Sequence, residues 1–539
     1  MLAALKQVAD DIEAAGTNTR STMAKELFAS ITSTMSDRAA TCVRQNTLLQ
    51  MYREEILPIV RQSRPEEMGD EDVEALLKMN HFFCGLHSLV HLAENAVQAG
   101  EAAEKAIVGE AGIPSLNPAF QKKGESAAAR LIREGSKALS RGGDEKNGIY
   151  RQAFTFLRPV LKERYGALSL PIVNYRGNRF NILFTNSVAV YCLRNQLKEL
   201  LSISENPLIK SVSKGLNNDV VLAGVHALAK VAKSITGPFW RVMETKSINI
   251  VQMNQILTKL VKFFDDAAEN PSLLMEGNSP FDDEYIHRDQ WYADVFASNS
   301  RLDPHTSVIV GIMMKSFGAF ARRHFKDHLE GGVHANLTAE EVEGVPLHDM
   351  FSERGFGFWD RLKRFIPNIS SEGAEACLLF TMNKTLDWLE AKPADERERL
   401  IKACMQQTPK MKETFKERAL KIRQELESRL QRQLQEKAEK EAQQLRDKMA
   451  LQSKVEEQGG LWQSVDQMES ALQAIKDAAR GEAKKKRIDA IKAQMSYRKK
   501  VLQQSASATD FTFSENKVVL GEERLKEKLA KLISLVPSE

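Results

Sequence analysis

The stretch NHFFCGLHSLVHLAENAV, residues 80–97, decides how the first part of this chain folds. It is strongly apolar, and its pattern fits a segment that begins as a strand and ends as a helix. Inside it, Cys84, His87 and His91 fall at positions i, i+3 and i+7, which gives one helical face three ligands that zinc accepts. A structural zinc site needs four ligands, and no second C-x-x-C or H-x-x-x-H pair follows. Buried Cys and His in an apolar helix are more often core residues, so both interpretations stay open.

Toward the N-terminus, the segment ITSTMSD, residues 31–37, is rich in β-branched residues and ends on an acid, which predicts a strand. A helix interrupted at Pro58 is expected from residue 38 to about residue 62. Asp37 would then project into the crevice at the carboxyl end of the strand. Metal-dependent phosphoryl transfer places paired carboxylates at such edges, around two divalent ions about 4 Å apart. The alternative is that Asp37 is simply the N-cap of the next helix.

Toward the C-terminus, the segment RGNRFN, residues 176–181, places arginines beside an aromatic residue. Arg176, Arg179 and Phe180 would suit phosphate contacts next to a platform on which a base stacks. The alternative is a turn with solvated arginines.

The segment FSERGFG, residues 351–357, offers a second acid. Ser352 would cap a helix that holds Glu353 in its first turn, which is a sufficient structural explanation. A carboxylate in this place would also serve as the last ligand of a two-metal site.

Most of the remaining chain reads as helix. Residues 100–124 are rich in Gly, Pro and Ala and predict an irregular segment, and a helix is expected from residue 186 to about residue 202. From there to His328 the pattern is almost continuously helical, and a loop is expected over residues 331–346.

After Pro409, Glu, Lys, Arg and Gln dominate to residue 457, which predicts a long exposed helix. Its apolar residues recur every four positions, so a heptad coiled coil is not well supported. Gly459 and Gly460 should end this helix, and a helical hairpin hinged there is a reasonable expectation. The segment that follows, residues 483–502, is basic. Its cations would serve phosphate contacts or nuclear import, or form a solvated helix face: Lys484, Lys485, Lys486, Arg487, Lys492, Arg498, Lys499 and Lys500.

The composition and the absence of known motifs limit the cellular compartment and the classes of enzyme to which the chain could belong. The net charge of +4 over 539 residues is too small to prove a nucleic-acid partner by itself. Five scattered cysteines are no disulfide framework and fit a reducing compartment. No apolar run of about 18 residues is present, so we expect no membrane span. Acids at Asp10, Asp11 and Glu13 argue against a signal peptide, so we expect a nuclear or cytoplasmic protein. The motifs of P-loop, dinucleotide-binding, zinc-protease and serine-hydrolase enzymes do not occur.

The order of the motifs resembles the transposases of the hAT superfamily. The resemblance rests on an acid that ends a strand, a C-x-x-H motif, an Arg-aromatic pair, a long helical stretch and an S-E-R-x-F motif, carried by Asp37, Cys84, His87, Arg179, Phe180 and residues 352–356. The chain is also similar to multicopy animal proteins of transposon type, which share FFCGLH, GNRFN and DHLEGG segments and bring no known activity.

The resemblance implies a particular fold and site. In that family, an RNase H-like core is split by a large helical insertion. Asp37 would correspond to the second catalytic acid and Glu353 to the third, both as ligands of divalent ions. Arg179 and Phe180 would replace an Arg-Trp pair near a flipped base. Cys84 and His87 would match the C-x-x-H motif, whose role here is not assigned.

This sequence also departs from the family pattern. Family members carry a first Asp on the first core strand, yet no strand is predicted before Ile31, and Asp10 and Asp11 lie in a helical pattern. A BED-type zinc finger is not found either, and the last motif reads FG rather than FS. Losing one metal-bridging acid should remove most activity, so we expect a chain that does not cut DNA by itself. Mg²⁺ or Mn²⁺ would bind only at a functional acidic site, and no other cofactor is expected.

Together these observations predict a mainly α protein with a small β component. Residues 1–199 would form the first part of a partial RNase H-like core, 200–335 the helical insertion, 336–408 the return of the core, and 409–539 a charged helical tail. The predicted function is that of a transposase-derived protein that binds DNA and is catalytically incomplete. The alternative is a scaffold that associates with itself or with a partner helix through residues 409–504.

Overall fold

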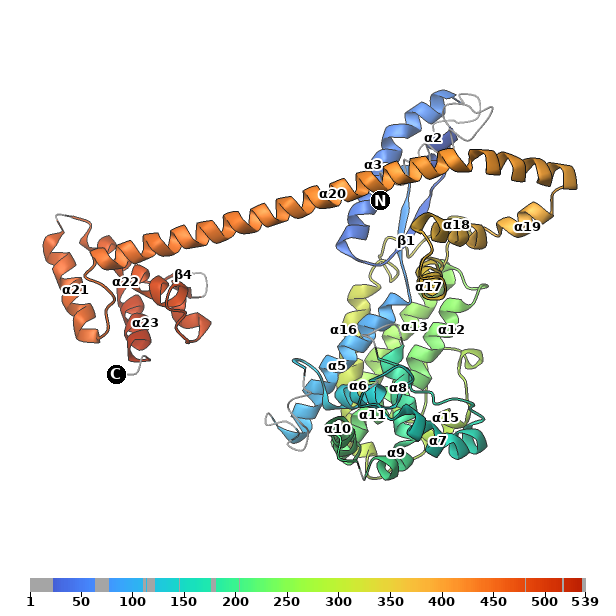
Figure 1. The fold of residues 1–539 in the computed structure, drawn as a ribbon. Helices are drawn as coiled ribbons and strands as arrows, with labels where there is room; N and C mark the ends of the chain where they lie inside the picture. Colours follow the sequence, from blue (N-terminus) through green and yellow to red (C-terminus); the bar gives the residue numbers. More distant parts are fainter. Residues whose placement is uncertain are drawn as a thin grey trace. The chain divides into compact units, whose positions relative to one another are not determined.

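The computed structural model describes residues 23–63, 77–109, 113, 122–144, 146–175, 181–202, 204–479, 481–515 and 518–535. The chain divides into two units, Met1–Phe358 and Trp359–Glu539. Helices make up most of the described residues, which confirms the mainly α prediction (Figure 1). Each unit has a core of its own.

A short parallel sheet opens the first unit. Strand β1 (Ser33–Ser36) pairs with β2 (Asn80–Phe83), with Ser33 opposite Asn80 and Ser36 opposite Phe83. Helix α3 (Ala40–Ser63) lies between them in the sequence, and α2 (Met23–Ala29) packs against α3. Thr34, Phe82 and Phe83 are residue types that a pleated strand favours, and the prediction of both strands is confirmed.

Two sequence-based boundaries in this region are wrong. Helix α3 continues through Pro58, where an interruption was expected. Helix α5 (His87–Val108) continues through Gly100, although an irregular segment was expected from residue 100. The cause is close packing, because a Cβ atom built on Gly100 would lie 3.1 Å from the side chain of Ser126 at the start of α6 (Ala127–Leu139). Tertiary contact therefore outweighs the low helix propensity of glycine at this position.

The centre of the first unit is one long buried helical segment. It consists of α11 (Asp219–Val231), the π-helical turn η2 (Ala232–Thr236) and α12 (Gly237–Glu244). The π turn precedes Pro238, which lacks an N–H group and whose ring would clash with the carbonyl four residues earlier. The segment 219–244 is long and apolar enough to cross a membrane, but 83% of its apolar window is buried inside the protein. It is therefore better explained as a core helix, and no other described helix passes the same test.

The remaining helices of the first unit surround this segment. Helix α16 (Asp303–His324) packs against α5, α11 and α13 (Ile250–Glu269), and α8 (Ile182–Cys192) packs against α11 (Figure 1). One core cluster extends from Phe82 to Leu347 and includes residues from the predicted insertion, 200–335. The other elements of this unit are α7 (Tyr150–Tyr165), α9 (Arg194–Leu201), α10 (Pro207–Leu216), α14 (Ser272–Met275), η3 (Asp283–Tyr285) and α15 (Gln290–Phe296).

The boundary between the units, after Phe358, falls within helix α17 (Met350–Phe365). The second unit continues with α18 (Ser371–Met382) and α19 (Thr385–Glu390). Helix α20 (Ala394–Glu457) has 64 residues, almost all exposed, and it passes through Pro409. Gly459 and Gly460 follow its end with φ values of 87° and 90°, a conformation that favours glycine.

The residues after these glycines form a small helical unit around a buried tryptophan. Helices α21 (Val465–Ala478), α22 (Ala483–Lys500) and α23 (Glu522–Ser534) bury apolar side chains around Trp462, which is 1% exposed. The helical turn η4 (Ala508–Phe511) and the antiparallel pair β3 (Ser514–Glu515) and β4 (Val518–Val519) connect α22 to α23. Helix α22 also packs against α20. Residues 459–535 therefore fold around a core of their own rather than as a two-helix hairpin.

Candidate functional site

Three segments that are far apart in the sequence meet at the carboxyl edge of the β1–β2 pair. Because the strands are parallel, Asp37 follows β1 and Cys84 follows β2 at the same edge. The backbone N–H of Cys84 donates to the carbonyl of Ser36 at 2.8 Å. The third segment is the loop before α17, where the carbonyl of Leu347 accepts a hydrogen bond from the N–H of Gly85 at 3.0 Å.

The side chains of Cys84, His87 and Asp349 converge at this edge. Their ligand atoms all lie within 4.8 Å of one another, and His87 Nδ1 is 3.8 Å from Asp349 Oδ1. The backbone N–H of Asp349 donates to Cys84 Sγ at 3.4 Å. Cys84 is buried, and the other two side chains are half-buried. Sulfur, nitrogen and oxygen donors in this combination are those that Zn²⁺ accepts.

Gly85 permits the close approach that brings the third segment in. A Cβ atom built on Gly85 would lie 2.6 Å from both Sδ and Cε of Met243, and 3.2 Å from the carbonyl oxygen of Leu347. The thioether end of Met243 is flexible and can move, whereas the carbonyl of Leu347, in the loop that carries Asp349, would have to shift slightly. The glycine of the C-G-L-H motif therefore favours the close approach of this loop to Cys84.

The charges at the edge are set by burial and by short contacts. Burial raises the pKa of the Cys84 thiol to about 12; the carboxylate of Asp349 acts in the same direction, whereas the backbone N–H of Asp349 lowers the pKa. The pKa of Asp37 is lowered chiefly by a hydrogen bond from the Cys42 thiol, with further contributions from the Ala39 N–H and from His87. Asp37 and the C-x-x-H motif therefore interact electrostatically.

The capping interpretation of Asp37 is also supported by a contact. Its Oδ1 accepts a hydrogen bond from the N–H of Ala39 at 3.1 Å, just before α3 begins. The neighbouring Arg38 ties the strand end to the protein body. Its guanidinium lies 4.3 Å from the centroid of the Phe83 ring and 2.8 Å from Asp327 Oδ2.

Other predicted ligands lie apart from this cluster. His91 pairs with Glu94 at 3.2 Å, and its ring lies 5.5 Å from that of His324, so the cluster takes Asp349 in place of His91. Glu353 is exposed in the first turn of α17. Helix α17 begins at Met350, before Ser352, so Ser352 does not cap it. The acid of this segment that joins the cluster is Asp349, four residues before Glu353.

Sequence reasoning missed Asp349. The signal was an acid immediately before the helix that carries the S-E-R motif, in the place where Asp commonly stands. Only the contact of residues 347–349 with the C-x-x-H turn distinguishes it from an ordinary capping residue.

The predicted nucleic-acid contacts fall into three groups. Arg176, Arg179 and Phe180 lie outside the described residues. Five of the predicted lysines are exposed on α22, namely Lys484, Lys485, Lys486, Lys499 and Lys500. The two arginines of this helix have other partners, because Arg487 binds both carboxylate oxygens of Glu522, at 2.5 and 3.0 Å, and Arg498 is 2% exposed and donates to the carbonyl of Trp462. Arg498 therefore cannot serve as the surface phosphate contact that its sequence neighbourhood suggested.

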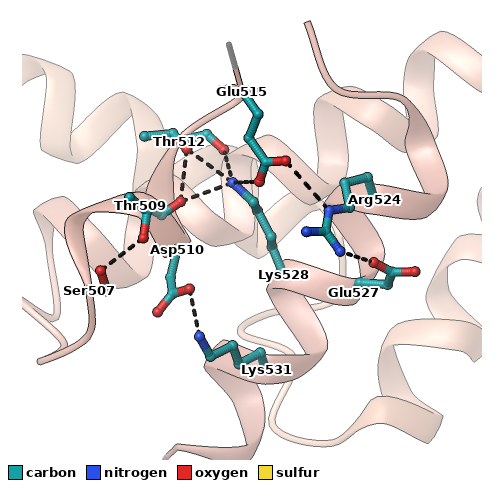
Figure 2. A network of polar contacts seen from close by, with 9 residues as sticks. All are labelled: Ser507, Thr509, Asp510, Thr512, Glu515, Arg524, Glu527, Lys528 and Lys531. Atoms are coloured by element: carbon teal, nitrogen blue, oxygen red, sulfur yellow. Dashed lines mark hydrogen bonds and ion pairs between the residues drawn. The ribbon is translucent and has the colours of Figure 1, made fainter. Parts of the chain in front are cut away.

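Beside α22, a second group of cations is neutralised within the C-terminal unit. Figure 2 shows Lys528 of α23 aimed at the backbone and side chain of the 509–515 segment. Its Nζ donates to the carbonyls of Thr509 and Thr512, at 2.9 and 3.2 Å, and lies 3.0 Å from Glu515 Oε1. Lys531 pairs with Asp510 at 2.8 Å. These lysines hold the connection between α22 and α23, so the exposed lysines of α22 are the better candidates for an external anion.

Comparison of the chain with protein-family models, with curated proteins and with solved structures finds no match in any of the three.

Proposed function

We propose that this chain is a transposase-derived protein that binds DNA and does not by itself carry out strand transfer. One observation supports the link to hAT transposases above the others. The strand-end acid and the C-x-x-H motif meet at one strand edge, and the loop leading into the S-E-R helix meets them there. The resemblance relates these same motifs, although Cys84 and Asp349 are separated by 265 residues in the sequence.

The proposed loss of strand transfer is supported by the ligands at this edge. A two-metal centre holds its ions with several carboxylate oxygens. Among the described residues, the acids of this edge are Asp37, which accepts hydrogen bonds from the Ala39 N–H and the Cys42 thiol, and Asp349, which faces a thiol and an imidazole. Glu353 is exposed one turn further along α17. This donor set suits a single borderline-soft ion better than a pair of Mg²⁺ ions.

The proposed DNA contacts are the exposed lysines of α22. Lys484, Lys485 and Lys486 stand in the first turn of the helix, where the helix dipole is positive and does not favour cations. A phosphate group bound there would relieve both the mutual repulsion of the lysines and their repulsion by the dipole. Lys499 and Lys500 extend the basic surface to the other end of the same helix.

The test is the salt dependence of binding to duplex DNA, measured by fluorescence anisotropy. Each phosphate contact contributes roughly −0.9 to the slope of log K against log salt. We expect a steep slope for the full chain and a slope that is shallower by about 2.7 for Lys484→Gln/Lys485→Gln/Lys486→Gln, since three contacts are removed. The matched control replaces three exposed lysines of α20, Lys421, Lys437 and Lys440, by Gln and should keep the slope. Absence of DNA binding at low salt would overturn the proposal.

The second part of the proposal needs a separate assay. With Mg²⁺ or Mn²⁺ and duplex DNA, the full chain should show no nicking or strand transfer. Turnover that Glu353→Ala abolishes would show that the acidic site is functional and would remove the claim of catalytic incompleteness.

A scaffold function remains the second candidate because α20 exposes an apolar row. Ile422, Leu426, Leu430 and Leu434 are each more than half exposed, at 52 to 58%. If this row pairs with the same row of a second chain, light scattering of the full protein should give a mass above 60.6 kDa. Replacing the four residues by Gln should return the monomer mass, whereas Gln at exposed Leu168 should not.

A further inference from the structure

The side chains of Cys84, His87 and Asp349 at the strand edge form a potential metal site, whether or not the protein binds DNA. We propose that Cys84 Sγ, His87 Nδ1 and Asp349 Oδ1 bind one Zn²⁺ ion, with water at the fourth position. The three ligand atoms already lie within 4.8 Å of one another, and a tetrahedral ion with ordinary bond lengths would draw them to about 3.5 Å. They come from the turn after β2, the first residue of α5 and the loop before α17.

The backbone holds these ligands in place. The N–H of Cys84 joins the turn to Ser36 at the end of β1, and the N–H of Gly85 joins the turn to Leu347 in the loop before α17. The N–H of Asp349 already points at Cys84 Sγ, at 3.4 Å. Such outer contacts orient ligands and support the thiolate form that a metal requires. The site is therefore organised before any ion arrives.

One polar atom of the cluster lacks the contacts that burial demands. Asp349 Oδ1 is inaccessible to solvent and has no hydrogen-bond partner in the part of the chain that the structure describes. Its nearest charged neighbour is His87 Nδ1, at 3.8 Å, beyond hydrogen-bond distance. A buried carboxylate oxygen without a partner is costly, and a cation between Asp349 and His87 would supply one.

The donor set selects the ion. One thiolate, one imidazole and one carboxylate neutralise the two positive charges of a divalent ion, and thiolate disfavours Mg²⁺ and Ca²⁺. Three protein ligands with an open fourth position differ from the closed four-ligand sites of zinc fingers. His91, which the i, i+7 spacing nominated as a third ligand, is replaced by Asp349, which follows Cys84 by 265 residues.

The proposed ion would fasten the loop of residues 345–349 to the strand edge. It would bind the folded protein and not the unfolded chain, and so it would raise the free energy of unfolding. A zinc ion here would also fix the start of α17, because Asp349 directly precedes Met350.

The first test measures metal content in the untagged full chain after purification without chelator. We expect about one zinc ion per chain by mass spectrometry of the metal, since a thiolate–imidazole–carboxylate site retains zinc through purification. Asp349→Asn, which keeps size and shape, should lose it, and so should Cys84→Ser. Cys404→Ser, which changes an exposed cysteine of α20, should keep it.

The second test replaces zinc by Co²⁺ and records the absorption spectrum. A thiolate-to-cobalt charge-transfer band should be present in the full chain and in Cys404→Ser and absent in Cys84→Ser. Circular dichroism of each variant shows whether it is folded.

A folded full chain that takes up neither zinc nor cobalt would overturn the proposal, and so would unchanged metal content in folded Asp349→Asn. Both results would mean that the cluster is a His87–Asp349 ion pair beside a thiol. Loss of DNA binding alone would change neither readout, so the two proposals can fail separately.

Discussion

The surroundings of Lys528 and of Asp349 show two ways in which this chain treats a charged side chain that is mostly buried. The side chain of Lys528 is 8% exposed and that of Asp349 is 17% exposed. Lys528 finds two backbone carbonyls, a hydroxyl and a carboxylate within the same unit (Figure 2). Asp349 leaves one oxygen without a hydrogen bond among the described residues.

Whether a buried charged group finds all its hydrogen-bond partners within the protein distinguishes a structural network from a candidate binding site. A polar network in which each group has a hydrogen-bond partner within the protein stabilises the fold and needs no ligand. A buried oxygen without a protein partner calls for an explanation, and a bound water, ion or ligand is one. The network around Lys528 is therefore structural, and the strand edge is the candidate binding site.

Lowering the pH should give the largest difference in stability between the first unit, which contains Asp349, and the second unit, which contains Lys528. All ten histidines lie in the first unit. Burial lowers the pKa of His328 from 6.5 to about 4 and that of His324 to about 3. Arg38 and His334 lower the pKa of His328 further, and Asp327 opposes them.

The sign of the effect follows from these pKa values. A lowered pKa means that the folded state prefers the neutral ring. This contribution to stability is present above pH 6.5 and is lost as the pH falls toward 4, on the order of 5 kcal/mol for the two rings together. In the second unit, Lys531 and Lys528 lower the pKa of Asp510 and Glu515, whose contributions are lost only as the pH falls below about 4.5.

Hydrogen exchange measured by mass spectrometry from pH 7 to pH 4 would follow each unit separately. The first unit should lose protection at a higher pH than the second. His328→Gln should move this loss to lower pH, and His287→Gln, at an exposed position, should not. Simultaneous loss in both units would contradict the comparison.

Lys528→Met should have the next largest effect. It leaves the carbonyls of Thr509 and Thr512 and the carboxylate of Glu515 without their shared cation, which we expect to cost about 3 kcal/mol in the free energy of unfolding of the second unit. Urea denaturation followed by tryptophan fluorescence measures it. Lys526→Met is the matched control: Lys526 lies two residues before Lys528 and pairs with the exposed Glu523, so its loss should cost less than about 0.5 kcal/mol. Equal effects would mean that the network is not the stabilising feature.

Gly85→Ala tests the strand edge in the same way. The added methyl group would meet Met243 at 2.6 Å, and we expect a loss of about 2 kcal/mol in the first unit together with weaker zinc binding. Gly357→Ala is the control, because nothing lies within 4 Å of a Cβ atom at that position. A thermal-shift assay with and without zinc would measure both effects. A stable Gly85→Ala variant with unchanged metal content would show that the loop does not need this close approach.

Arg487→Gln should have the smallest effect. The pair with Glu522 is half-buried, and its loss should lower the free energy of unfolding of the second unit less than Lys528→Met does. The salt slope of DNA binding should stay unchanged, because Glu522 already occupies the guanidinium. A shallower slope in this variant would place Arg487 among the DNA contacts and would extend the proposed surface.

Local sequence patterns predicted the helical character and both strands of the βαβ unit, because β-branched and aromatic runs act over a few residues. They also brought Asp37 and the C-x-x-H motif into consideration. The patterns failed where distant packing decides. Asp349 joins Cys84 only through the loop contact with Gly85, and Arg498 is buried because Trp462 and its loop cover α22. Neither contact leaves a periodic signal in the sequence.

The hydrogen bond between Asp349 and Cys84 closes a loop of 265 residues, which has a consequence for the synthesis of the protein. A ribosome that adds about 5 to 20 residues per second needs roughly 10 to 50 s to proceed from the C-G-L-H turn to the last ligand. Throughout that interval Cys84 has left the ribosome ahead of its partner loop. Its thiol is then open to chaperones, oxidants and free metal in a way that it never is in the finished fold.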